Sequence, residues 1–365
     1  MSKCIMLGVD VHDATLVVRM AEDAQAPETL RVENTTEGRR GLWRDVRERR
    51  ERVGAARVVI AYEASAQGFG LCDEARAEGF DCYVLAPTKI AHSASHRRRK
   101  SDEHDAAVIL DLLRGHLLAG NELPSVWVPD AQTREDREIV RARLDAAEKI
   151  SALKAQVQTL LKRCSQRRPK ATGKGWTNGF AAWLTGLAAA GSPLAHGARV
   201  ALGSLLRQKS ALEEESVRLD GEVAALAEQA RYAEPAQAMK IKGVGLLTAL
   251  VVLTEMGDLS RFENRKQVGA FLGLTPTSHE SGEHDDCKGH ITHQGPWRVR
   301  RALCQCAWSR IRTNAQEKAA YARIVAKNPK HKKIAVVAIM RRLAVLLWHL
   351  GREAQIKHGC FAEAA

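Results

Sequence analysis

Residues 5–18, IMLGVDVHDATLVV, decide the fold of the first part of the chain. The apolar run Ile5–Val9 ends at Asp10, and a second run, Thr15–Val18, is rich in β-branched residues. Two apolar runs joined by so short a connector predict a β-hairpin. We therefore expect the Asp10 carboxylate at the point where a strand ends.

Strand and helix patterns alternate after this hairpin, up to about residue 120. The expected elements are a strand at 30–32, a helix at 37–52, a strand at 57–62, a helix at 70–77 and a strand at 80–85. Glu63 lies at the end of the fully buried strand 57–62. This order predicts an α/β fold of the ribonuclease-H-like type. No GxGxxG follows the first strand, which argues against a dinucleotide-binding domain.

A further helix begins near Ser101, a plausible N-cap, and runs to about Leu118. Asp102 and Asp105 are three residues apart, so they share one helix face. Apolar residues continue that face, which should pack on the sheet and turn both aspartates toward the strand ends. The alternative is that they only complement the helix dipole in its first turn.

Four carboxylates, Asp10, Glu63, Asp102 and Asp105, thus lie where strands end or a helix begins. An unpaired charge beside an apolar run is costly. A cluster of carboxylates is tolerated there when it holds a hard divalent cation such as Mg²⁺. The pattern predicts a Mg²⁺-dependent site that acts on phosphate esters.

The charge balance points to a polyanionic partner. The chain has 365 residues, which predicts two or three domains, and a net charge of +13. Such an excess is typical of proteins that bind nucleic acid, although a merely soluble basic protein is the alternative. Eight scattered cysteines, no signal peptide and no span-length apolar stretch predict a reduced, cytoplasmic protein without a membrane segment.

The middle of the chain changes to long helical patterns. Residues 133–163 and about 205–230 carry apolar residues at approximate heptad spacing, separated by Gly and Pro between residues 169 and 193. This predicts an antiparallel helical hairpin or coiled coil, within one chain or across a dimer.

The last third contains a glycine turn and a strongly basic segment. Lys242-Gly-Val-Gly245 opens an apolar helix, whose N-terminal N–H groups could bind a phosphate, although ordinary helix packing explains the glycines as well. Residues 297–342 hold thirteen Lys and Arg residues against one acid, Glu317. An apolar face in the same segment predicts a folded, basic helix pair that binds phosphates.

Two loops carry further polar candidates. Ser281 precedes Gly282, and a loop serine is usually a turn residue unless a base or metal activates it. The zinc-ligand types His284, Cys287, His290 and His293 recur every three residues, without the pair-loop-pair spacing of structural zinc sites. We therefore favour loop contacts to nucleic acid there, through Lys288, Thr292 and His293.

Taken in order, short motifs along most of the chain resemble the DEDD insertion-sequence transposases, recombinases with a RuvC-like domain, a serine nucleophile and a structured bridge RNA. In the first part they are Gly8-Val-Asp10, Glu63-Ala64 and Lys100-Ser-Asp102-x-x-Asp105-Ala106. In the last part they are Gly243-Val-Gly245, Phe262, Gly273-Leu-Thr-Pro276, Glu280-Ser-Gly282, Gly295 and Arg300-Arg-Ala-Leu303.

The resemblance implies Ser281 as the nucleophile and a Mg²⁺ ion held by Asp10, Glu63, Asp102 and Asp105. It also implies DNA substrates, a guide RNA, and a homodimer or homotetramer in which one subunit's carboxylates meet another's serine. The expected domains are a RuvC-like domain (1–125), a helical coiled-coil region (126–234), a mostly α-helical transposase domain (235–352) and a tail (353–365).

The expected nucleic-acid contacts lie in both halves of the chain. They are Arg97, Arg98, Arg99, Lys100, Lys242, Gly243, Gly245, Lys288, Thr292, Arg298, Arg300, Arg301, Lys332 and Lys333. Two other functions stay open from the residues. One is a RuvC-like junction or flap endonuclease that uses metal-activated water, and the other is a nucleic-acid-binding scaffold without catalysis.

Overall fold

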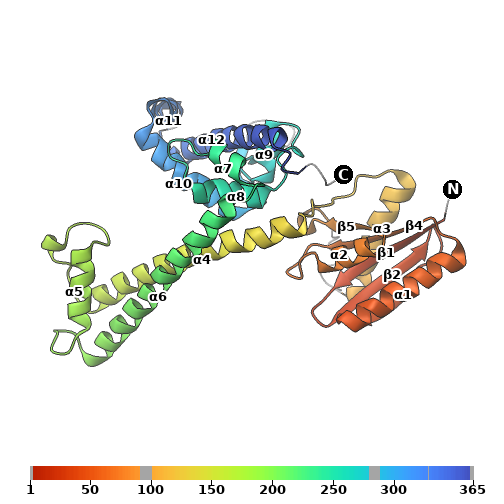
Figure 1. The fold of residues 1–365 in the computed structure, drawn as a ribbon, viewed down its shortest axis with the longest axis horizontal. Coiled ribbons are helices and arrows are strands. Elements are labelled where there is room, and N and C mark those ends of the chain that lie inside the picture. The colour runs from red at the N-terminus through yellow and green to blue at the C-terminus, as the bar shows by residue number, and fades with distance from the viewer. Residues whose placement is uncertain (1–2, 91–100, 279–287, 328, 362–365) are drawn as a thin grey trace. The chain divides into compact units, whose positions relative to one another are not determined.

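The computed structural model describes residues 3–90, 101–278, 288–327 and 329–361 (Figure 1). Within it the chain divides into two compact units, Met1–Val128 and Pro129–Ala365. The finer division into four segments stays a prediction.

The first unit is built on a mixed five-stranded sheet with the strand order β3-β2-β1-β4-β5. The strands are β1 (Cys4–Val11), β2 (Thr15–Glu22), β3 (Glu28–Glu33), β4 (Arg57–Glu63) and β5 (Asp81–Leu85). β1, β2 and β3 pair antiparallel, which confirms the predicted hairpin, whereas β4 and β5 run parallel to β1. A mixed α/β sheet at the N-terminus is therefore confirmed.

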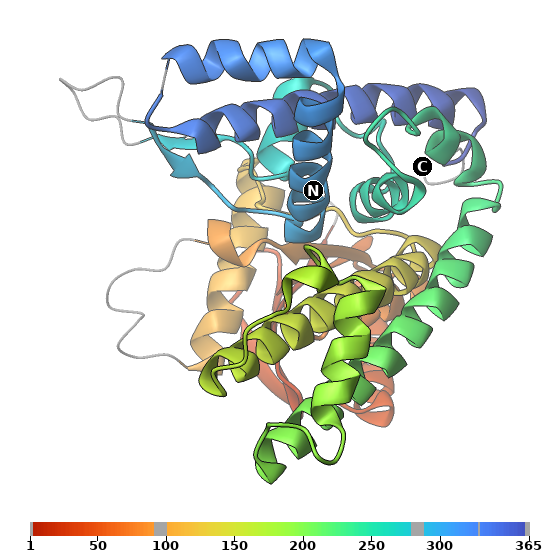
Figure 2. The ribbon, with the colours of Figure 1, turned by 90° about the vertical axis from the view of Figure 1, so that its left-hand side faces the viewer.

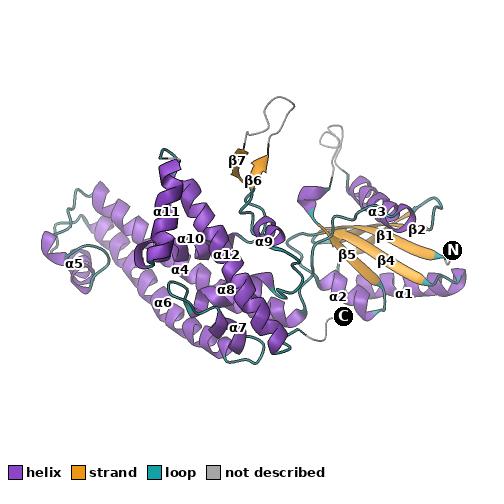
Figure 3. Cartoon of the chain, turned by 90° about the horizontal axis from the view of Figure 1, so that it is seen from above, coloured by secondary structure: helices purple, strands orange, loops and turns teal. Residues whose placement is uncertain are grey.

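Helices cover both faces of this sheet (Figure 3). α1 (Thr36–Val53) and α2 (Gly70–Ala77) lie on one face, and α3 (Asp102–Ala119) lies on the other. Successive side chains of a strand point to opposite faces. Val9 of β1 accordingly packs in the core under α1 and α2, whereas Met6 packs with Ile109 and Leu110 of α3.

Gly8 sets the distance between β1 and α3. A Cβ atom at this position would lie 2.5 Å from the Ala106 carbonyl oxygen and 2.4 Å from the Leu110 backbone nitrogen. Those are backbone atoms, which cannot swing aside as a flexible side chain could. The absence of a side chain at Gly8 therefore lets α3 lie directly against the strand.

The second unit begins with a helical hairpin. α4 (Ala131–Arg163) and α6 (His196–Ala227) are its long arms, and Arg143 of α4 pairs with Asp220 of α6 at 2.7 Å. The glycine- and proline-rich segment between them contains a helix that the sequence pattern did not predict, α5 (Asn178–Ala188) (Figure 2). α6 also begins nearer the N-terminus than expected. Coiled-coil geometry of the arms stays a prediction.

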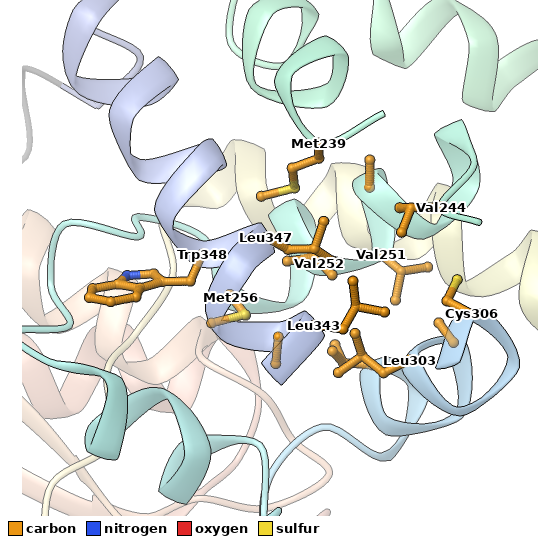
Figure 4. Packing of buried hydrophobic residues seen from close by; sticks show 14 of the residues in the cluster. Met239, Val244, Val251, Val252, Met256, Leu303, Cys306, Leu343, Leu347 and Trp348 are labelled. Carbon is orange, nitrogen blue, oxygen red and sulfur yellow. The ribbon is translucent and has the colours of Figure 1, made fainter. Parts of the chain in front are cut away.

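The rest of this unit is mostly helical. Its elements are α7 (Ala233–Ala238), α8 (Leu246–Met256), α9 (Arg265–Phe271), β6 (Pro276–Ser278), β7 (Lys288–Ile291), α10 (Trp297–Thr313), α11 (Ala315–Lys327) and α12 (Lys332–Lys357). Their core surrounds Val251 and Val252 of α8, with Leu303 from α10 and Leu347 from α12 (Figure 4).

α12 is the one described helix that is long and apolar enough to cross a membrane. Half of its most apolar window is buried inside the unit, where Leu343, Leu347 and Trp348 belong to the core. These properties are those of a core helix of a folded domain.

Candidate functional site

The ends of two neighbouring parallel strands bring Asp10 and Glu63 to the same edge of the sheet. Val9 of β1 is the register partner of Tyr62 of β4, and each acidic residue comes next in its strand. Side-chain alternation assigns Asp10 to the face of Met6 and Glu63 to the face of Ala61. Met6 and Ala61 lie on the same face of the sheet, which is the face covered by α3.

Asp102 and Asp105 lie in the first turn of α3. Ala106, in the next turn, is the residue whose carbonyl lies over Gly8, two residues before Asp10. The close backbone contact at Gly8 thus brings the start of α3 to the end of β1. Ser101 occupies the N-cap position with extended backbone, but its side chain makes no capping hydrogen bond.

His12 joins two of these carboxylates. Its Nε2 atom lies 3.0 Å from Asp10 Oδ2 and 3.3 Å from Asp102 Oδ1. The sequence analysis missed this residue, because a histidine in a hairpin connector is usually an exposed polar side chain. Its position two residues after Asp10, where a strand places side chains on the same face, is the signal that could have found it.

Asp10, His12 and Asp102 form the one group of three metal-ligand side chains found in the described part of the chain, with ligand atoms within 4.8 Å of one another. Asp105 is outside this group but acts on it electrostatically. Burial raises the pKa of Asp10; His12 lowers it, and the nearby Asp105 and Asp102 carboxylates raise it further. Glu63 is also outside the group, at the end of the adjacent strand.

This arrangement suits a divalent cation. Converging carboxylates repel one another, and a bound cation would remove the repulsion that raises the pKa of Asp10. Carboxylate oxygens are ligands of both Mg²⁺ and Mn²⁺. An imidazole nitrogen is compatible with Mn²⁺, which is the softer ion. The residues present therefore fit a metal site at this edge of the sheet.

Comparison with known proteins matches both units. Residues 7–166 match the DEDD transposase family of IS110 type, described as Transposase, and residues 236–322 match the Transposase IS116/IS110/IS902 family. Two segments of the chain thus match domains of IS110/IS116-family DEDD transposases. The edge of the sheet that carries Asp10, Glu63, Asp102 and Asp105, which we call the carboxylate edge, lies within the first of these two matches.

Individual transposases are similar over different shares of the chain. The y4qE transposase of Sinorhizobium fredii is 29% identical, over 96% of this chain and 89% of its own. The transposase of insertion sequence element IS1533 from Leptospira borgpetersenii is 22% identical, over 84% and 86%. The transposase of element IS1111A from Coxiella burnetii is 31% identical, over 30% of each chain.

Several of the arginines expected to bind nucleic acid make internal contacts in the structure. Arg298 of α10 donates to Asp145 of α4 at 2.9 Å, and Arg301 pairs with Glu148. Arg300 donates to the Leu272 carbonyl at 3.1 Å, as well as to two carbonyls of the loop before α10. Their contact with nucleic acid stays a prediction.

The glycine turn before α8 is partly filled by a side chain. Arg310 donates to the Lys242 carbonyl at 2.7 Å, and a Cβ at Gly243 would lie 2.7 Å from Arg310 Cγ. Gly245, the N-cap of α8, is exposed and has open space around it. Of the predicted phosphate-binding turn, Lys242 and the N-terminus of α8 at Gly245 are therefore the accessible parts.

The remaining predicted contacts have varied surroundings. Lys332 and Lys333 are exposed at the start of α12. The backbone N–H of Thr292 donates to the Thr275 carbonyl at 2.9 Å, while its hydroxyl is buried with no partner in the described part. His290 and His293 belong to no group of three metal ligands among the described residues.

Some predicted residues lie outside the described residues. They are Ser281, His284 and Cys287, within residues 279–287, and Arg97, Arg98, Arg99 and Lys100, within residues 91–100. The side chain of Lys288 is likewise outside the description. The roles assigned to these residues stay predictions.

Proposed function

We propose that this transposase cuts and rejoins DNA strands by combining the carboxylate edge with the hydroxyl of Ser281. The observation that carries the proposal is the convergence of Asp10 and Asp102 on His12, in a domain that matches the DEDD transposases. The resemblance of Glu280-Ser-Gly282 to the family motif supports Ser281 as the nucleophile.

In this proposal Asp10, Glu63, Asp102 and Asp105 hold a Mg²⁺ ion. When bound, Mg²⁺ supplies positive charge that stabilises the transition state of phosphoryl transfer. The protein's own contribution is the placement of these carboxylates by β1, β4 and α3. His12 keeps two of them together through its contacts with Asp10 and Asp102.

The proposed covalent step conserves the bond energy of the DNA. The Ser281 oxygen attacks the scissile phosphorus and loses its proton, a serine phosphodiester forms, and one DNA end leaves as a hydroxyl. Attack of a DNA hydroxyl on the same phosphorus reverses the step and frees Ser281. Strand exchange by this route needs no ATP.

We further propose that a structured guide RNA selects the DNA, and that the active assembly is a homodimer or homotetramer. The resemblance to bridge-RNA recombinases supports both statements. A protein of this kind reads mainly the shape and phosphates of its RNA, while base pairing reads the DNA sequence. Sequencing the RNA that co-purifies from cells carrying the native flanking DNA tests this; no discrete RNA would contradict it.

Substitution of Ser281 by alanine tests the covalent step. We expect Ser281→Ala to abolish the protein–DNA adduct on a denaturing gel while DNA binding changes little. Ser278→Ala, three residues away, is the matched control and should keep the adduct. If Ser281→Ala still recombines a plasmid substrate, the nucleophile assignment is wrong. Cleavage without any adduct in the unaltered protein would instead favour hydrolysis by metal-activated water.

A further inference from the structure

The far end of the helical hairpin, residues 149–212, contains no acidic residue. We call this segment the hairpin tip. It carries eleven Lys and Arg residues, whereas the other 301 residues hold all 43 acids together with 45 Lys and Arg. The other residues thus contain about one acid in seven, and at this density a stretch of 64 residues would hold about nine acidic residues. Most protein surfaces intersperse both signs, so this segregation calls for a physical reason.

The tip is an ordered structure with its own core. Phe180 and Leu184 of α5 are buried against Val157 of α4 and Leu202 of α6. Thr177 caps α5, with its hydroxyl accepting from the Phe180 backbone N–H at 3.2 Å. The cations of the tip are therefore carried on a defined scaffold.

Four of the eleven cations are half-buried and support this scaffold. The Arg168 guanidinium lies 3.9 Å from the ring centre of Phe180 and donates to Thr172. The other three are Lys154 and Lys209, which lie on the Trp176 ring, and Arg199, which donates to the Leu194 carbonyl. Lys209 also pairs with Glu213, just beyond the tip, at 2.6 Å. These four positive charges are thus already engaged by neighbouring groups.

The other seven cations are exposed. They are Lys149, Lys162, Arg163, Arg167, Lys170, Lys174 and Arg207. None of them forms an ion pair with a described carboxylate. The basic segment 297–342 differs, because Arg298, Arg301 and Arg310 there are paired with Asp145, Glu148 and Glu317.

We propose that the hairpin tip binds the phosphodiester backbone of duplex DNA. Single-stranded nucleic acid is held on exposed aromatic rings, and insertion into a membrane surface requires exposed apolar side chains. The tip, which is described in full, offers neither. Phe180 is 2% exposed, Trp176 and Trp183 are half-buried, and Val200 is its one exposed large hydrophobic residue. This inference rests on the proposed function, since a transposase has to hold DNA. Unpaired cations without base-reading groups suit sequence-independent phosphate contacts.

Charge neutralisation in the full-length protein tests the proposal. The tip variant carries Arg163→Gln, Arg167→Gln, Lys170→Gln and Lys174→Gln, and its binding to a labelled DNA duplex is followed by fluorescence anisotropy over a range of salt concentrations. Each phosphate contact contributes about one to the slope of log affinity against log salt. We expect the slope to fall by about three to four, and affinity at moderate salt to fall at least tenfold.

The matched control removes the same charge from the first unit, through Lys3→Gln, Arg40→Gln, Arg52→Gln and Arg76→Gln, all exposed positions. We expect less than a threefold change in affinity from the control. Unaltered thermal unfolding of both variants would show that folding is not the cause. Equal losses in both variants, or no loss in the tip variant, would overturn the proposal, as would a loss confined to duplex RNA. Adduct formation at saturating DNA should stay normal in the tip variant, which separates this result from a failure of the Ser281 chemistry.

Discussion

The carboxylate edge of the first unit and the hairpin tip of the second use charge in opposite ways. At the edge, Asp10 and Asp102 converge to within hydrogen-bonding distance of one imidazole, and their contribution to function depends on the position of each atom. At the tip, seven unpaired cations are spread over an exposed surface, and their value lies in their sum. A single substitution should therefore be severe at the edge and mild at the tip.

The largest expected effect is at the edge. Asp102→Asn keeps the shape of the side chain but removes the charge that holds a cation, so we expect strand cleavage to fall by about 10²–10³-fold or more. Thermal unfolding should change little, because Asp102 is partly exposed. Glu103→Gln, one position along the same helix, is the control and should retain cleavage. Full cleavage in Asp102→Asn would remove this residue from the metal site.

A substitution at Gly8 tests whether cleavage depends on the close approach of α3 to β1. Gly8→Ala adds one methyl group against the α3 backbone, and overpacking of this kind costs about 1–3 kcal/mol. We expect lower unfolding free energy in denaturant titrations, together with reduced cleavage, since α3 must shift and carry Asp102 with it. Gly41→Ala, which meets open space on α1, should be neutral or stabilising. Normal cleavage in a stable Gly8→Ala protein would contradict this account of the site.

His12 tests how closely the edge is tuned. His12→Ala removes the group between Asp10 and Asp102, so we expect the metal concentration for half-maximal cleavage to rise by about 10–100-fold. Cleavage at saturating metal should be largely restored. A titration with Mg²⁺ and Mn²⁺ measures this. An unchanged requirement for both metals would show that His12 has no part in holding the ion.

The hairpin that carries the tip can be destabilised by a substitution at its base, where α4 begins. Asp130 caps α4 and accepts two hydrogen bonds from Arg231, at 2.9 and 2.6 Å. Burial would raise the pKa of Asp130, but hydrogen bonds from Arg231 and Thr133 outweigh it and lower the pKa to about 2. Because the folded pKa lies below the unfolded one, Asp130 stabilises the fold above about pH 4.

We accordingly expect Asp130→Asn to lower the unfolding free energy by about 1 kcal/mol at neutral pH, because it removes a partly exposed and therefore screened ion pair with Arg231. The gap between the two proteins should close as pH falls from about 4 toward 2. Chemical denaturation at several pH values measures it. A gap that stays constant over this range would show that the charge of Asp130 is unimportant.

The smallest effect belongs to one tip cation. Lys174→Gln should lower affinity for duplex DNA by about two- to threefold and reduce the salt slope by about one. Further substitutions should add to this loss because exposed, separate charges act independently. A loss from Lys174→Gln as large as that of the fourfold variant would show that the tip is a specific site, and the contrast with the carboxylate edge would fail.

Local patterns predicted much of the first unit. The apolar runs of β1 and β4, and the polar break before α3, mark the elements and place Asp10, Glu63, Asp102 and Asp105 at their ends. The bridging role of His12 could not be found in this way, because it depends on the approach of α3 across the sheet. That approach is set by a contact between Gly8 and Ala106, which are 98 residues apart.

In the second unit, too, local patterns predicted some features and tertiary packing decided the others. Heptad spacing predicted the arms of the hairpin, but not α5, whose apolar residues form a core only when α4 and α6 enclose them. The density of Arg and Lys in 297–342 predicted a phosphate-binding surface, which stays a prediction. Only the tertiary structure shows that three of its thirteen cations, all arginines of α10, are paired with carboxylates, two of which lie on α4.

By itself the sequence determined the element types, the acidic ends of strands and helix, and the total excess of positive charge, because these follow from local periodicity and composition. Only the tertiary structure decided which charges meet. Packing brings Asp10, His12 and Asp102 together and pairs three of the α10 arginines with carboxylates, but leaves seven cations of the acid-free tip without a carboxylate partner. The physical reason is that Coulomb and hydrogen-bond energies depend on distance in space, and that distance is set by the packing of residues far apart in the chain.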